Sequence, residues 1–132
     1  MNSVDTTYVP GVCNINRTEI AKRRRLGYVG VVSFTLLLAL LITVPIPASG
    51  RLVLFLPAFL AASGFLQARN KFCVGFAVAG VQRASDAQSK ITSVVDETAR
   101  QSDKRKAYSL NFQAAGIGLI ATCCALAVPS IV

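Results

Sequence analysis

The chain contains no histidine and no tryptophan, and its 6 acidic residues are outnumbered by 14 Lys and Arg residues. Without histidine, neither a Ser-His nor a Cys-His nucleophile pair can be built, and zinc loses its usual nitrogen ligand. The sequence also lacks a CxxC pair and a Gly-rich phosphate loop. We therefore expect no enzymatic activity, no metal-binding residues and no cofactor.

Charge is scarce as well: 15 % of the 132 residues are charged, whereas 53 % are hydrophobic. A soluble domain of this length would have too little polar surface to cover such a core. The composition predicts a single integral membrane domain over residues 1–132. The net charge of +8 comes without the aromatic-plus-basic strip that base stacking requires, so we expect no nucleic-acid partner.

Long apolar runs predict an all-α membrane protein with transmembrane helices at about 26–44, 52–68 and 108–131. The first run would extend about 28 Å, the thickness of a hydrocarbon core. Asn16 and Glu19 have the spacing of a capping box, so this helix should begin at Asn16 and continue through the basic cluster. The segment before the run is too long for an ordinary signal peptide, so we expect the run to be retained.

The connection between the second and third spans, residues 69–107, is polar and is expected to be partly helical. Residues 72–81 are too few to cross a bilayer, so they either continue the second helix or lie along the interface. Residues 83–106 carry apolar and small side chains at three- and four-residue spacing, which predicts an amphipathic helix capped by Ser85 or Asp86. We interpret it as a solvated helix that leans on its neighbours.

The basic residues predict the topology. Residues 1–25 hold 5 of the 14, the 69–107 connection holds 8, and Arg51 is alone in the loop after the first span. The positive-inside rule places the N-terminal segment 1–16 and the connection in the cytoplasm, with the C-terminus outside, in a bacterial-type cytoplasmic membrane. The residues expected to set the topology and meet lipid headgroups are Lys22, Arg23, Arg24, Arg25, Arg69, Lys71, Lys104, Arg105 and Lys106.

No charged residue falls inside the three predicted spans, which argues against a pump or a secondary transporter. Small residues recur there instead, and small residues let helix backbones approach closely in lipid. They would pack within this chain or on a partner. The predicted packing faces are Gly27, Gly30, Ala58, Ala62, Ala114, Gly118, Ala121 and Ala125.

The stretch Tyr8–Asn16 is uncharged and precedes the first helix. Val9-Pro10-Gly11 predicts a type II turn, and Asn14 or Asn16 would cap the helix. We expect an ordered lid folded against the cytoplasmic ends of the first two helices, with Tyr8 at the headgroup boundary and disorder confined to residues 1–6.

Cys13 in this lid and Cys73 after the second helix would both lie at the cytoplasmic interface. If they are neighbours, they could form a redox-sensitive disulfide, bind a metal with partner ligands or accept a lipid. The favoured interpretation is two reduced thiols packed as small hydrophobic groups, because the cytoplasm is reducing.

These patterns favour a small non-enzymatic integral membrane protein that acts by helix association. It would be an accessory or assembly subunit of a larger membrane complex, or a homo-oligomer. Its expected partners are membrane lipids and other membrane subunits or itself. The alternative function is a thiol-redox or metal-binding site built on Cys13 and Cys73, and the third is an oligomeric channel or transporter.

Overall fold

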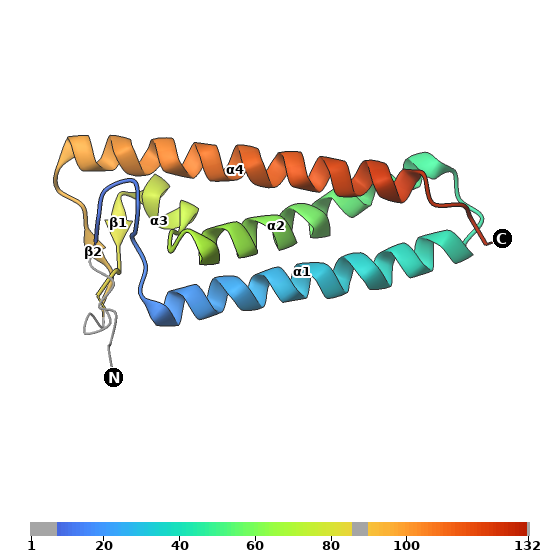
Figure 1. Cartoon of the computed structure of the whole chain (residues 1–132), viewed down its shortest axis with the longest axis horizontal. Helices are drawn as coiled ribbons and strands as arrows, with labels where there is room; N and C mark the ends of the chain where they lie inside the picture. The colour runs from blue at the N-terminus through green and yellow to red at the C-terminus, as the bar shows by residue number, and fades with distance from the viewer. Residues whose placement is uncertain (1–7, 86–89, 132) are drawn as a thin grey trace.

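The computed structural model describes residues 8–85 and 90–131. Within these residues the chain is mostly helical, and three helical segments are long and apolar enough to cross a membrane. They are α1 (Arg17–Thr43), the 3-10 helix η1 (Ala48–Leu54) continued by α2 (Phe55–Arg69), and α4 (Glu97–Leu126). The three run side by side with α2 between α1 and α4 (Figure 1). The predicted all-α class with three membrane-length helices is confirmed.

The ends of these helices follow local chemistry. Asn16 is the N-cap of α1, because its side-chain oxygen accepts the Glu19 amide at 3.1 Å, as predicted. The second span starts as a 3-10 helix, and Pro57 lies in the first turn of α2, near the change from 3-10 to α-helix. The third helix ends at Leu126 rather than at residue 131, since Pro129 cannot continue a helix.

The predicted amphipathic helix over residues 83–106 is wrong for its first half. Residues 83–85 and 90–96 are not helical, and a short antiparallel pair joins β1 (Val81–Gln82) to β2 (Thr92–Ser93). The helix begins only at Glu97, where the Asp96 carboxylate accepts the Thr98 amide at 3.3 Å. Ser85 is not a cap, because its carbonyl accepts from the Asn16 side chain, and the alternative cap Asp86 lies outside the described residues.

Residues 72–81 do not continue α2. Lys71 adopts a left-handed backbone (φ 53°) that reverses the chain, and the separate helix α3 (Val74–Ala79) follows. Phe72 is fully buried in a cluster with Ala77 of α3 and with Ala107 and Leu110 of α4. The apolar side chains of this segment therefore pack against α4.

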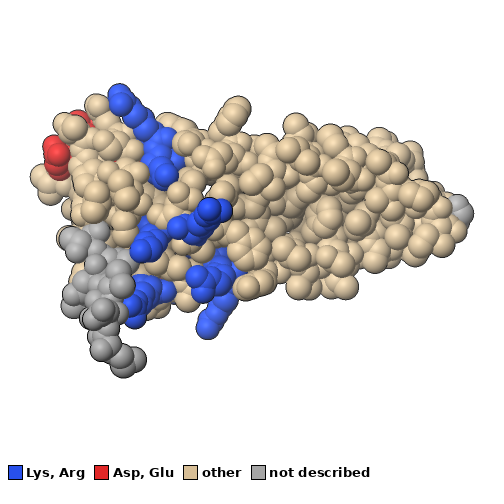
Figure 2. All heavy atoms as spheres, in the orientation of Figure 1, with Lys and Arg blue, Asp and Glu red and all other residues tan. Residues whose placement is uncertain are grey.

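We call residues 8–16, 70–85 and 90–103 the cap, and the apolar remainder of the three long helices the shaft. The cap lies at one end of the helices, where the N-terminal segment crosses from α1 toward α4 (Figure 1). Lys and Arg side chains gather between cap and shaft on the face drawn in Figure 2, and that face of the shaft is free of charged residues.

Candidate functional site

An apolar groove runs along the shaft where α1 and α4 flank α2. Its volume is about 250 Å³, and every side chain that lines it is apolar. Alanines of α2 form its floor, and aromatic and branched side chains of α1, α2 and α4 form its walls. The lining residues are Val31, Phe34, Ala58, Ala61, Ala62, Phe65, Ile117 and Ala121.

The glycines of α1 and α2 let these two backbones touch. A Cβ added at Gly30 would lie 2.4 Å from the Ala61 nitrogen, and one at Gly64 would lie 2.5 Å from the Gly27 nitrogen. Real Cβ atoms do not come this close to backbone atoms, so only glycine fits at either position. The structure thus brings the predicted packing residues Gly27 and Gly30 together with α2 inside the same chain.

Some small residues of α4 are buried in helix packing, and another faces the groove. Ala114, Gly118 and Ala125 are buried, and a Cβ at Gly118 would lie 3.2 Å from the Phe59 nitrogen of α2. Ala121 is only half-buried and faces the groove. On α2, Ala58 and Ala62 are buried and also line the groove floor.

Lid residues 8–16 contact the start of α1 and the segment after α2, as predicted, and they also bond α4, which was not predicted. The Val12 amide donates to the Val9 carbonyl at 3.0 Å and Gly11 has φ 69°, as the predicted turn requires. The fully buried Asp103 of α4 accepts from the Tyr8 hydroxyl at 2.7 Å and from the Gly11 amide at 2.8 Å. Tyr8 therefore bonds α4; residues 1–6 lie outside the described residues.

Burial raises the pKa of Tyr8 above its ordinary value, and the hydrogen bond and negative charge of Asp103 raise it further. Each of these favours the neutral phenol over a second negative charge beside the carboxylate. The hydroxyl is thus held as a hydrogen-bond donor.

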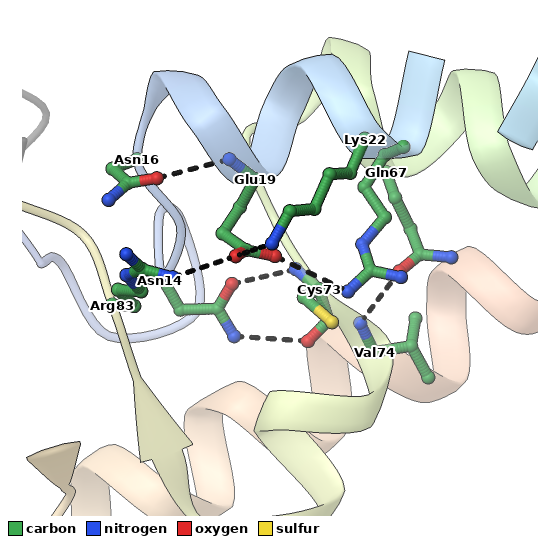
Figure 3. A network of polar contacts seen from close by, with 9 residues as sticks. Asn14, Asn16, Glu19, Lys22, Gln67, Cys73, Val74 and Arg83 are labelled. Atoms are coloured by element: carbon green, nitrogen blue, oxygen red, sulfur yellow. Dashed lines mark hydrogen bonds and ion pairs between the residues drawn. The ribbon is translucent and has the colours of Figure 1, made fainter. Parts of the chain in front are cut away.

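Asn14 joins the lid to the segment after α2 (Figure 3). Its side chain accepts from the Cys73 amide at 2.7 Å and donates to the Cys73 carbonyl at 3.1 Å. Its own amide donates to Lys71, and its carbonyl accepts from the Arg83 amide at 2.8 Å. Asn14 is fully buried, so this one residue links three segments of the cap.

A buried carboxylate lies beside this link. Glu19 is 4 % exposed, and its oxygens contact Lys22 at 2.8 Å, Arg83 at 3.1 Å and Arg23 at 3.8 Å (Figure 3). Separately, the side-chain oxygen of Gln67 accepts the Val74 amide at 3.0 Å. The Arg83 contact thus ties the start of α1 to the segment after β1, and the Gln67 contact ties the end of α2 to α3.

The thiols of Cys13 and Cys73 are both buried and both free. Their segments are neighbours, because Asn14 follows Cys13 and bonds Cys73. Burial raises the pKa of the Cys13 thiol, and the Ile15 hydrogen bond and the Lys71 charge oppose that rise. A protonated thiol is a poor nucleophile and metal ligand. Within the described residues, no group of three or more His, Cys, Asp or Glu residues is placed to hold a metal ion.

Arg51 has a structural role that the sequence did not reveal. Its side chain is buried and donates to the Ala125 carbonyl at 3.0 Å, to the Val128 carbonyl and to the Ser130 hydroxyl at 2.7 Å. Ala125 lies in the last turn of α4 and Val128 just beyond it, where carbonyls lack partners further along the helix and a cation suits the negative end of the helix dipole. Arg51 therefore ties the loop after α1 to the end of α4.

The residues predicted to meet headgroups lie where the helices enter the cap. Most are exposed, whereas Arg23 and Lys106 are half-buried. Comparison with protein-family models, with curated proteins and with solved structures finds no match for this chain. Its function has to be argued from the groove, the cap and the charges between them.

Proposed function

We propose that this chain is a small non-enzymatic integral membrane protein that acts by helix association, as an accessory or assembly subunit of a larger membrane complex or as a homo-oligomer. The observation that supports this best is the alanine-floored groove of the shaft. Its occupant would be a transmembrane helix.

Helix association in lipid is driven by packing, because lipid tails are as apolar as leucine. A helix laid into the groove could approach the backbone of α2 over Ala58, Ala61 and Ala62, with Phe34 and Phe65 as walls. The close contact of Gly30 with Ala61 holds α1 against α2, so one wall of the groove is fixed before any partner arrives.

We further propose that the cap faces the cytoplasm and that the C-terminus lies outside. The basic residues between cap and shaft favour this orientation under the positive-inside rule. Arg51, the lone basic residue of the opposite side, is buried against the end of α4 and adds little exposed charge there.

The first test is purification of the full chain with two different tags from a membrane extract in mild detergent. We expect a distinct membrane protein, or the second tagged copy, to co-purify in fixed ratio. Recovery of the second tag supports the homo-oligomer, and recovery of another membrane protein supports the accessory subunit. A monodisperse monomer without either partner would overturn the proposal.

A matched pair of variants tests the groove itself. Ala121→Phe fills the groove from α4, whereas Ile120→Phe, on the next residue, alters a side chain that is 66 % exposed. We expect only the first to lose the partner, with about a tenfold drop in retention for each 1.4 kcal/mol of lost packing. Equal retention by both variants would exclude the groove as the contact surface.

A further inference from the structure

A second cavity, of about 200 Å³, lies in the cap between the end of α3 and the first turns of α4. Unlike the groove of the shaft, it carries ionisable side chains from α4. Its lining residues are Val78, Ala79, Gly80, Glu97, Arg100 and Lys104. None of them takes part in the network around Asn14 or in the contact between the lid and Asp103.

Arg100 lines this cavity, and its guanidinium is not fully hydrogen-bonded. Its Nε–H is buried without a hydrogen-bond partner, and within the described residues its guanidinium makes no ion pair. This Nε–H lies against Gly80 and is closed off from the cavity, so the donors that the guanidinium offers to a ligand there are those of its terminal nitrogens. Arg23 and Arg51 also have an unbonded Nε–H, but Arg23 contacts Glu19 and Arg51 donates to carbonyls.

Gly80 fixes where the guanidinium sits. It ends α3 with a left-handed backbone (φ 72°), and a Cβ there would lie 2.9 Å from Arg100 Nε. The Gly80 carbonyl accepts the Val94 amide at 2.8 Å, so the turn that forms this wall is tied to the segment before α4. The cavity is therefore shaped by backbone as well as by side chains.

Lys104 lies one helical turn after Arg100 and has no acceptor in the described part of the chain, so the cavity wall presents two cations on one face of α4. Glu97 lies one turn before Arg100, and the three ionisable groups sum to a single positive charge. We propose that this cavity binds a phosphate group, with Arg100 and Lys104 as donors. Phosphate fits because the planar guanidinium presents paired donors that match its oxygens, and lysine adds a point charge.

The phosphate could belong to a soluble phosphate ester or to an anionic lipid headgroup, since Lys104 is also among the basic residues between cap and shaft. This inference does not depend on helix association. Glu97 provides a specific test of this site, because removal of its negative charge should strengthen the binding of an anion.

The test uses the full chain in two arms. In detergent, the shift in melting temperature is titrated with inorganic phosphate and with glycerol phosphate. In nanodiscs, retention of phosphatidylglycerol over phosphatidylcholine is measured by native mass spectrometry. Saturable binding in the first arm identifies a soluble ligand, and selective retention in the second arm alone identifies a lipid. No binding in either arm overturns the proposal.

Variants then assign the site. Arg100→Gln and Lys104→Gln should each weaken binding about tenfold, as expected for loss of a charge-assisted hydrogen bond. Glu97→Gln should strengthen it about threefold. Lys90→Gln, in the cap but outside the cavity lining, should leave it unchanged. Equal losses in Arg100→Gln and Lys90→Gln would show general attraction to basic charge and would refute the site.

Arg100→Lys separates charge from geometry, because it keeps the positive charge and removes the paired guanidinium donors. We expect a loss smaller than that of Arg100→Gln, with an unchanged melting temperature in phosphate-free buffer. Binding by Arg100→Lys as strong as that of the unaltered chain would refute the role given to the paired guanidinium donors.

Discussion

The cap and the shaft are held together by different interactions. In the shaft, backbones meet at Gly27, Gly30 and Gly64, and shape decides which helices pair. In the cap, buried polar side chains such as Asn14 and Asp103 bond backbone groups of distant segments. The difference follows from the surroundings. Lipid offers no gain for burying apolar surface, so close packing decides, whereas a small cap exposed to water has little apolar core and depends on satisfied hydrogen bonds.

The largest loss of stability should come from a substitution that forces the helices of the shaft apart. Gly30→Leu forces a side chain into the Ala61 backbone and should lower the free energy of unfolding by about 3 kcal/mol. Unfolding in mixtures of mild detergent and dodecyl sulfate measures this loss. Gly116→Ala is the control, because no atom lies within 4 Å of a Cβ there, and it should change stability by less than about 0.5 kcal/mol.

The second-largest loss of stability should come from a substitution in the cap. Asn14→Ala removes both hydrogen bonds to Cys73 and leaves a buried amide without an acceptor, which should cost about 2 kcal/mol. Hydrogen exchange at the Cys73 amide should accelerate, while exchange along the shaft stays slow. Uniform acceleration along the shaft would contradict an independent cap.

A smaller, pH-dependent effect should come from Tyr8. Its folded pKa is raised, so its contribution to stability is fully present below the ordinary tyrosine value near 10 and is lost as pH rises through the folded pKa. Tyr8→Phe should cost about 1 kcal/mol at neutral pH and should abolish this alkaline loss. The near-ultraviolet absorbance of tyrosinate follows the titration, and the difference between the two proteins isolates Tyr8. Ionisation of Tyr8 at its ordinary pKa would refute the contact with Asp103.

The smallest effect should come from the exposed surface at the start of α1. Lys22→Ala removes one of three cations around Glu19, and the lysine side chain is 57 % exposed, so the cost should be about 0.3 kcal/mol. Glu19→Ala should cost several times more, since it leaves Arg23 and Arg83 without their acidic partner. Equal costs for both variants, measured by the same unfolding assay, would contradict the buried network.

The shaft could be predicted from the sequence because its signals are local. Apolar runs of sufficient length and the Asn16 cap define α1, whereas the third helix was predicted to run past Pro129 to residue 131 and instead ends at Leu126. The cap could not be predicted, because its bonds join residues far apart in the chain. The sequence around Asn14 is equally compatible with a helix cap and with a hydrogen-bonded link to Cys73, because asparagine suits both roles. The spacing of apolar residues over 83–96 resembled a helix, but pairing of β1 with β2 prevails there.

The bond between Tyr8 and Asp103 joins positions 95 residues apart, and the first and second membrane-length helices lie between them. The lid can close only after the start of α4 has been synthesised. It also requires both ends of that long interval to emerge on the same face of the membrane. Closure of the cap therefore requires that both helices cross: a chain in which only one of the two crossed the membrane would carry its lid on the opposite side from Asp103.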